Sequence, residues 1–143
     1  MIERWNRDCL ALKPHWISLL IGINDMWRRY DQGDPTPVDR FEQEYRILVD
    51  RINDELNARL ILCEPFLLPI TEDHMSWRED LDPKIEVVHR LAREFKAILV
   101  PLDKVFKEAS LRQIPAYWAP DGVHPSLAGH ALIAQAWLRH VGA

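Results

Sequence analysis

The chain has 143 residues, of which 48% are hydrophobic and 28% charged, and its formal net charge is −4. This composition is ordinary for a globular protein, and we expect residues 1–143 to form a single domain. A net negative charge excludes the basic face that nucleic-acid binding needs. The longest apolar run, from Trp16 to Ile21, is far shorter than the ~20 residues of a membrane span. We therefore expect neither a nucleic-acid partner nor a membrane span. With no signal peptide ahead of the first helix, we expect a cytoplasmic location.

The first predicted elements are a helix and a strand. Ile2, Trp5, Cys9 and Leu12 recur at helical spacing, and no capping residue stands before them, so the chain enters this helix midway. The apolar run from Trp16 is typical of a parallel strand that is buried on both faces. Apolar surroundings at Cys9 and at Cys63 predict buried, reduced thiols rather than a disulfide.

The next predicted elements are a helix and a second strand. Thr36 is expected to cap the helix, with Pro37 at its first position and Asp39 in its first turn. Five apolar residues at helical spacing mark its buried face: Phe41, Tyr45, Leu48, Ile52 and Leu56. Residues 59–64 then read as a second buried strand.

The last third continues the alternation of helix and strand. A polar stretch over residues 65–80 predicts a loop, and the helix after it buries Leu81, Ile85, Val88, Ala92 and Phe95. A third strand at 97–100, a short helix at 102–111 and a loop at 113–125 follow. Ser126 is expected to cap a final helix that faces inward with Leu127, Ala131, Ala134 and Leu138. The order predicts an α/β fold with right-handed crossovers and one parallel sheet.

Gly22-Ile23-Asn24-Asp25 directly follows the first predicted strand. Ligands of such sheets bind beyond the carboxyl ends of the strands, and the Asn24 amide could donate a hydrogen bond to a developing oxyanion there. Glycine, asparagine and aspartate also form turns, so this block could equally serve only to reverse the chain.

A second block, Asp121-Gly122-Val123-His124-Pro125, lies just before the last helix. An aspartate three residues ahead of a histidine can hold the imidazole in one tautomer, so that its other nitrogen acts as a general base. The alternative is a turn followed by a helix boundary. A metal site built from Asp121, His124 and His130 would have no recognised ligand spacing, so we expect no metal, and nothing points to a cofactor.

In this order and separation, the two blocks resemble those of the SGNH (GDSL) hydrolase family, especially its acetylxylan-esterase-like members. The flanks Arg4-Trp5, Lys13-Pro14-His15-Trp16, Met26 to Asp31 and Pro125 to His130 extend the resemblance through nearly the whole chain. The resemblance implies a flavodoxin-like three-layer α/β/α sandwich with a parallel sheet, and an ester hydrolase.

The resemblance also implies site roles: His124 as the base, Asp121 as its orienting partner and Asn24 as an oxyanion-hole donor. The family's serine and glycine blocks precede the part to which Met1 corresponds. Two strands, a helix and their loops, on the order of 50 residues, would therefore have no counterpart here. The four serines read instead as part of a buried strand, a loop, a helix end and a helix cap: Ser18, Ser76, Ser110 and Ser126. We expect a truncated fold with little or no esterase activity on its own.

The same comparison bears on partners and substrate. The family's first strand would pair with residues 16–21, so that this strand becomes an apolar edge and a site for oligomer formation or for a strand-pairing partner. Trp27, Tyr30 and Trp118 could stack on sugar rings, and the resemblance implies an acetylated carbohydrate or another small ester as substrate. Core packing is the alternative for each aromatic residue, and a lysophospholipase or thioesterase activity stays open.

Three interpretations therefore compete. The chain is the carboxyl-terminal portion of an SGNH esterase, a non-catalytic module whose open edge accepts another polypeptide, or an unrelated small α/β ligand-binding domain.

Overall fold

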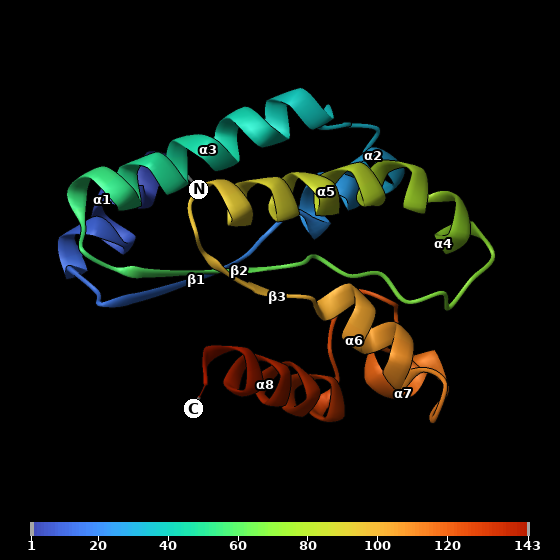
Figure 1. The fold of residues 1–143 in the computed structure, drawn as a ribbon. Coiled ribbons are helices and arrows are strands. Elements are labelled where there is room, and N and C mark those ends of the chain that lie inside the picture. The colour runs from blue at the N-terminus through green and yellow to red at the C-terminus, as the bar shows by residue number, and fades with distance from the viewer. Residues whose placement is uncertain (1, 143) are drawn as a thin grey trace.

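The computed structural model describes residues 2–142 and has three layers (Figure 1). The middle layer is a parallel sheet of β1 (Trp16–Leu20), β2 (Arg59–Cys63) and β3 (Ile98–Val100), in the order β1-β2-β3. Helices α3 (Val38–Glu55) and α5 (Arg78–Glu94) cover one face, and α6 (Leu102–Ala109) and α8 (Leu127–Val141) cover the other. The predicted α/β sandwich with a parallel sheet is thereby confirmed.

The register of the sheet follows from its two crossovers. Leu20 pairs with Cys63, and Cys63 pairs with Val100, so the carboxyl ends of all three strands lie at one edge. Both crossover helices, α3 and α5, lie on the same face, which makes successive strands add in one direction.

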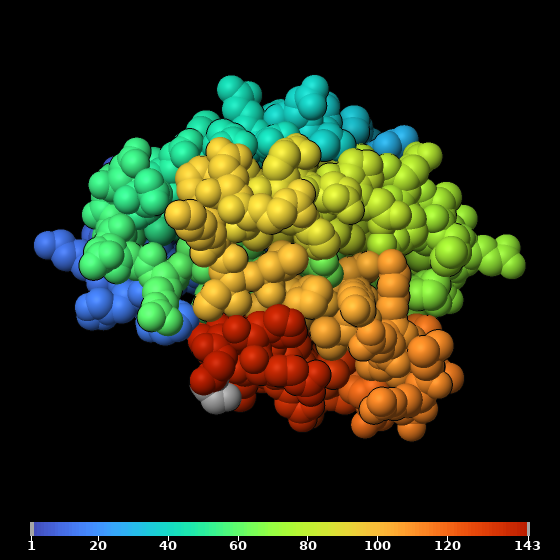
Figure 2. Space-filling model, in the orientation of Figure 1, coloured from blue at the N-terminus to red at the C-terminus, as the bar shows by residue number. Residues whose placement is uncertain are grey.

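Two apolar cores lie on opposite faces of β2. Leu62 faces α3 and α5, whereas Ile61 and Cys63 face α6 and α8. In the space-filling view the side chains of α3 and α5 form one continuous layer, and α8 forms the opposite one (Figure 2). Cys9 and Cys63 are buried free thiols, as predicted, and burial raises the pKa of Cys63 to about 11.

The expectation that β1 is buried on both faces is wrong. Ile17 and Leu19 are buried under α3 and α5, but Trp16 and Leu20 on the other face are 42% and 44% exposed. Ser18, expected in a buried strand, is exposed as well. The reason is that α8 packs mainly against β3, and at β1 its Trp137 indole N–H donates to the Ser18 hydroxyl, 2.8 Å away.

The predicted first helix is broken into η1 (Ile2–Arg4), α1 (Trp5–Asp8) and η2 (Leu10–Leu12). Cys9 leaves the helical conformation (φ −133°, ψ −66°), which interrupts the periodicity. Trp5 and Cys9 are therefore buried as expected, whereas Leu12 is 71% exposed.

Three expectations about helix positions also need correction. Pro37, not Thr36, precedes the first residue of α3, because its ψ of 148° keeps it extended. Helix α2 (Ile23–Asp31) follows β1 directly and was not predicted; of the Gly22–Asp25 block, only Gly22 precedes it. The predicted loop at 65–80 is buried through Leu68 and contains α4 (Asp73–Ser76) and the start of α5.

The predicted inward face of α8 is wrong, because the helix is rotated about its axis by about one residue relative to the prediction. Leu127 is 91% and Leu138 46% exposed, and Ala131 and Ala134 are exposed too. The helix instead packs on the core with Leu132, Ile133, Ala136, Trp137 and Val141. Gly129 fixes this rotation because a Cβ there would lie 2.3 Å from the carbonyl oxygen of Trp118 in α7 (Pro115–Trp118).

Within residues 2–142, no helix combines the length and the apolar character needed to cross a bilayer. The cytoplasmic location stays a prediction.

The first testable prediction concerns a buried ion pair within α5. Lys84 is fully buried, and its Nζ lies 2.7 Å from Oδ2 of Asp80. Asp80→Ala would leave the ammonium without its partner and should lower the free energy of unfolding in urea by about 3–5 kcal/mol. The control Asp82→Ala removes an exposed partner of Arg78 on the same helix and should cost about 0–1 kcal/mol. Equal losses in the two variants would contradict the prediction.

Candidate active site

Three segments meet at the carboxyl end of the sheet: α2 after β1, residues 64–74 after β2, and the loop at 119–125 before α8. Ligands of open parallel sheets bind at this end. Gly22 makes the sharp exit from β1 with a φ of 117°, and a Cβ there would come within 3.1 Å of Pro65 and 3.2 Å of Phe41. The chain can therefore turn directly from strand into helix.

Asp121 and His124 form a hydrogen-bonded pair in the loop before α8. Nδ1 of His124 lies 2.6 Å from Oδ2 of Asp121, and the other carboxylate oxygen accepts the backbone N–H groups of His124 at 2.8 Å and of Val123 at 3.1 Å. A carboxylate can only accept, so Nδ1 carries the proton and Nε2 of the neutral ring has a lone pair. The His124 side chain is 70% exposed, so Nε2 is accessible to a reacting group.

The loop that carries this pair is fixed at both ends. The Ser126 backbone N–H donates to the Trp118 carbonyl at 2.8 Å, and the Ser126 hydroxyl donates to the Tyr117 carbonyl at 2.7 Å. The same hydroxyl accepts the Gly129 N–H, which confirms Ser126 as the cap of α8. Val123 is buried beside Met26 and Leu67, which holds the middle of the loop against α2 and the segment after β2.

Of the residues predicted to bind substrate, Trp27 lies at the pair. Its ring centroid is 5.2 Å from that of His124, with a tilt of 59°. Asn24 lies one turn earlier on α2, and residues three apart on a helix share a face. Asn24 is exposed and lines an open groove of about 730 Å³ together with Asp25, Arg28 and Tyr45. Trp27 thus lies beside His124, whereas Asn24 lines a groove whose described lining includes neither His124 nor Trp27.

Tyr30 and Trp118 lie in packed surroundings instead. Tyr30 stacks on Trp77 at a centroid distance of 4.7 Å, and its hydroxyl is enclosed. Trp118 packs in the core under α8, where its indole N–H is also enclosed. Packing accounts for both positions better than contact with a ligand.

Two histidines without a partner at informative spacing in the sequence, His74 and His89, have defined contacts in the structure. His74 is buried, and its Nδ1 lies 3.0 Å from the Leu68 carbonyl. His89 contacts the buried carboxylate of Glu64, whose second oxygen accepts the Asp103 backbone N–H at 3.0 Å. The contact of His74 lies within one segment, six residues apart, whereas His89 and Glu64 are 25 residues apart, so spacing along the chain carried no signal for the pairing of His89.

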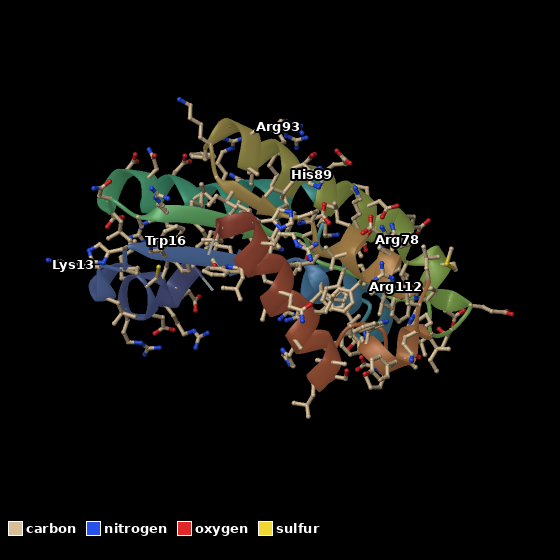
Figure 3. All side chains as sticks on the ribbon, turned by 60° about the horizontal axis from the view of Figure 1, so that its bottom comes forward. Lys13, Trp16, Arg78, His89, Arg93 and Arg112 are labelled. Atoms are coloured by element: carbon tan, nitrogen blue, oxygen red, sulfur yellow. The ribbon has the colours of Figure 1, made fainter. Side chains whose placement is uncertain are left out.

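Asp103 belongs to the same buried polar cluster. Burial alone would raise its pKa, but hydrogen bonds from Arg78 and Lys107 and the charges of these residues hold the pKa below its ordinary value. The two terminal guanidinium nitrogens of Arg78 donate to the two carboxylate oxygens of Asp103, at 2.6 and 2.9 Å. This cluster joins α5 to α6 and lies apart from the Asp121–His124 pair in the chain; Figure 3 shows Arg78 and His89 on α5.

The serine hydroxyls of the chain are engaged elsewhere. Ser76 and Ser110 donate to the backbone carbonyls of Asp73 and Phe106, and Ser18 accepts from Trp137. Among residues 2–142, no hydrogen bond joins a serine to His124, and no three His, Cys, Asp or Glu side chains gather as a metal site.

A groove of about 370 Å³ lies at the opposite, amino-terminal end of β2 and β3. Its described lining consists of Val49, Ile52, Asn53, Ala58, Arg59, Leu60, Phe95, Lys96 and Ile98. This lining contains no carboxylate, histidine, serine or cysteine, and its charged side chains are those of Arg59 and Lys96.

The second prediction concerns the pKa of Asp121. Burial alone would raise it, but hydrogen bonds from the backbone and side chain of His124 and from the Val123 N–H hold the pKa below its usual 3.8. Because the folded pKa is depressed, this contribution to stability is present above the unfolded pKa and is lost as pH falls through the folded pKa. NMR titration should therefore give a carboxyl midpoint below that of an aspartyl peptide.

His124→Ala should raise this midpoint only part of the way, because the backbone donors remain. His130→Ala, at an exposed residue on α8, should leave it unchanged. An unaltered protein that titrates at or above the peptide value would show that the loop donors do not hold the carboxylate.

Comparisons with known proteins identify the family of the chain. Residues 1–132 match the GDSL-like Lipase/Acylhydrolase family. An acetylxylan esterase of Geobacillus stearothermophilus is 36% identical over 97% of this chain and 64% of its own length. The crystal structure of a GDSL-like protein of Parabacteroides merdae is also 36% identical and superposes with a TM-score of 0.94. That match covers 99% of this chain and 66% of the other.

Crystal structures of the Geobacillus acetylxylan esterase superpose with a TM-score of 0.89 at 36% identity, over 99% of this chain and 66% of that one. Three further structures of this enzyme are described as catalytic mutants, in which a serine, an aspartate or the histidine three positions after that aspartate is replaced by alanine. The chain spans about two thirds of the length of these relatives. Because the family model matches residues 1–132 and a relative is 36% identical, the chain belongs to the GDSL-like lipase/acylhydrolase family.

Proposed function

We propose that this chain is the part of an ester hydrolase that supplies its acid–base pair and one oxyanion donor. The observation that carries the proposal is the hydrogen bond of 2.6 Å between Nδ1 of His124 and Asp121, because it leaves Nε2 of an exposed ring to act as a base. The spacing of aspartate and histidine in the catalytic mutants of the Geobacillus enzyme supports the same assignment.

The chemistry follows from these positions. Nε2 of His124 takes the proton of a serine hydroxyl as its oxygen attacks the ester carbonyl, and Asp121 stabilises the resulting imidazolium. The Asn24 amide donates to the oxyanion of the tetrahedral intermediate. His124 then returns the proton to the leaving alcohol, and water repeats the sequence to release the acid.

The nucleophile in this proposal comes from outside residues 1–143. In the Geobacillus enzyme the serine of the catalytic mutant precedes the aspartate by more residues than this chain has ahead of Asp121. The four serines present here lie in other hydrogen bonds or at a helix cap. The isolated chain should accordingly hydrolyse little or no ester.

The proposed substrate is an acetyl ester of a carbohydrate. The acetylxylan esterase of Geobacillus supports this choice, and so does the indole of Trp27 beside His124, because aromatic faces pack well on sugar rings. Longer acyl esters are the alternative class, and they would need an apolar channel next to Trp27.

We further propose that the free edge of β1 accepts the strand that completes the site. Trp16 and Leu20 lie exposed beside this edge, and Figure 3 shows Trp16 on the sheet surface to one side of α8. Bare apolar edges pair readily with other strands. If that strand came from another polypeptide, the chain would act first as an interaction module and only then as part of an enzyme.

The third prediction tests the proposed division of the site. The isolated protein should not hydrolyse p-nitrophenyl acetate above background. Fused behind the amino-terminal third of the Geobacillus esterase, it should gain an activity that a serine-directed phosphonate blocks. His124→Ala in the fusion should lower kcat by a factor on the order of 10⁴ or more, because the base is lost.

His130→Ala in the same fusion is the matched control and should retain full activity. Acetylated xylooligosaccharides compared with octanoyl esters would identify the substrate class. Hydrolysis by the isolated chain that disappeared in His124→Ala but not in His130→Ala would contradict the external nucleophile.

The fourth prediction concerns the edge of β1. The isolated chain should form oligomers in light scattering, and Leu20→Lys should shift it toward monomer, since a charge at the edge disfavours strand pairing. Leu111→Lys makes the same exchange at a residue that is 87% exposed and far from β1 in the chain, and it should not change the mass. A monomeric unaltered protein would refute the pairing.

A further inference from the structure

We propose that His74 is a positioning residue that holds the loop of Asp121 and His124 in its working geometry. The inference rests on the function proposed above, because it concerns the same pair. It assigns to a buried histidine a role that its position in the sequence did not indicate.

The imidazole of His74 ties the segment after β2 into a compact turn. Nδ1 lies 3.0 Å from the Leu68 carbonyl oxygen. The Ile70 N–H points at Nδ1 over 3.3 Å and at the Leu68 carbonyl over 3.0 Å, so these two acceptors compete for it. A carbonyl can only accept, and the Ile70 N–H has its shorter contact with the Leu68 oxygen, so we assign the proton to Nδ1, where it points at Leu68. The ring is 7% exposed, so this hydrogen bond is shielded from water.

The same ring lies against the backbone of the loop before α8. The Leu68 N–H donates to the Gly122 carbonyl at 2.9 Å, which joins the two segments. A Cβ on Gly122 would lie 2.9 Å from Cε1 and Nδ1 of His74 and 2.6 Å from the Leu68 oxygen. Gly122 also has a φ of 86°, a left-handed conformation that favours glycine. Since Gly122 directly follows Asp121, the position of the ring limits where the carboxylate can lie.

A series of aromatic contacts connects His74 back to His124 through α2. The ring centroid of Trp77 lies 4.5 Å from that of His74, and Trp77 stacks on Tyr30 with a centroid distance of 4.7 Å. Tyr30 is one turn after Trp27 on α2, and Trp27 contacts His124 at 5.2 Å. The pair is thus held from two sides: His74 contacts the backbone next to Asp121, and α2 contacts the ring of His124.

A donor at the position of Nδ1 distinguishes positioning from simple packing. Phenylalanine in place of His74 would fill the volume but leave the Leu68 carbonyl without its donor. Asparagine would lose volume but can place an amide N–H where Nδ1–H lies. If only the volume of the side chain matters, His74→Phe should preserve the loop better than His74→Asn. If the hydrogen bond to Leu68 sets the loop, His74→Asn should preserve it better.

The test measures the pair directly by NMR. In the unaltered protein the proton on Nδ1 of His124 should give a low-field signal that disappears in Asp121→Asn. In His74→Phe this proton should exchange with water about tenfold faster, the factor expected for loss of one ordinary hydrogen bond. The Asp121 carboxyl midpoint should rise toward that of a peptide, and His74→Asn should restore both values.

His89→Asn is the matched control, because it replaces a partly buried histidine whose partner, Glu64, lies outside this loop. It should lower the melting temperature without changing the His124 signal. If His74→Phe does not fold, His74→Leu serves in its place, because it also fills part of the volume without a donor for the Leu68 carbonyl.

His74→Phe could instead leave both the exchange rate of the His124 Nδ1 proton and the Asp121 carboxyl midpoint unchanged, and lower only the melting temperature, as His89→Asn does. That result would show that His74 only packs, and it would leave the proposed pair intact. Absence of an Asp121-dependent signal in the unaltered protein would instead remove the pair itself, and with it the proposed function.

Discussion

Burial of the continuous segment 61–68 is the constraint on which the rest of the structure depends. Its first three residues form the central part of the sheet, with one core on each face. The next residue, Glu64, places a carboxylate out of water, where it is satisfied by His89 and by the Asp103 backbone. Leu67 and Leu68 then form the surface on which the loop of Asp121 and His124 rests. The same segment therefore organises the cores and supports the site.

The Asp121–His124 pair combines exposure with a fixed geometry. Its side chains face solvent, but the residues between them, Gly122 and Val123, are both buried. Alternation of buried backbone and exposed functional groups lets a loop carry precise chemistry without a rigid secondary structure of its own. The hydrogen bonds that Asp121 accepts within the loop add a local constraint that survives small changes elsewhere.

Strong periodic signals in the sequence predicted most of the fold. The helix face from Phe41 to Ile52 and the helix from Leu81 to Ala92 were found correctly, because many residues at helical spacing agree with one another. The Asp121–His124 hydrogen bond was predicted because both residues lie in one short motif. Expectations failed where tertiary contacts decide: Gly129 against Trp118 sets the rotation of α8, and the limited reach of α8 exposes one face of β1. His74 escaped notice because Leu68 and Gly122, which give it a role, lie on different segments.

Helix α8 connects the loop of the Asp121–His124 pair to strand β1. At its start Ser126 anchors the loop of the Asp121–His124 pair, and three turns later, about 16 Å along the axis, Trp137 is hydrogen-bonded to Ser18 on β1. A strand or helix that docks beside β1 on this side would therefore contact the same helix that carries the histidine loop at its start. Because Asp121 and His124 are already hydrogen-bonded in this chain, a strand that completes the sheet would meet a base that is already oriented, as long as α8 keeps its position.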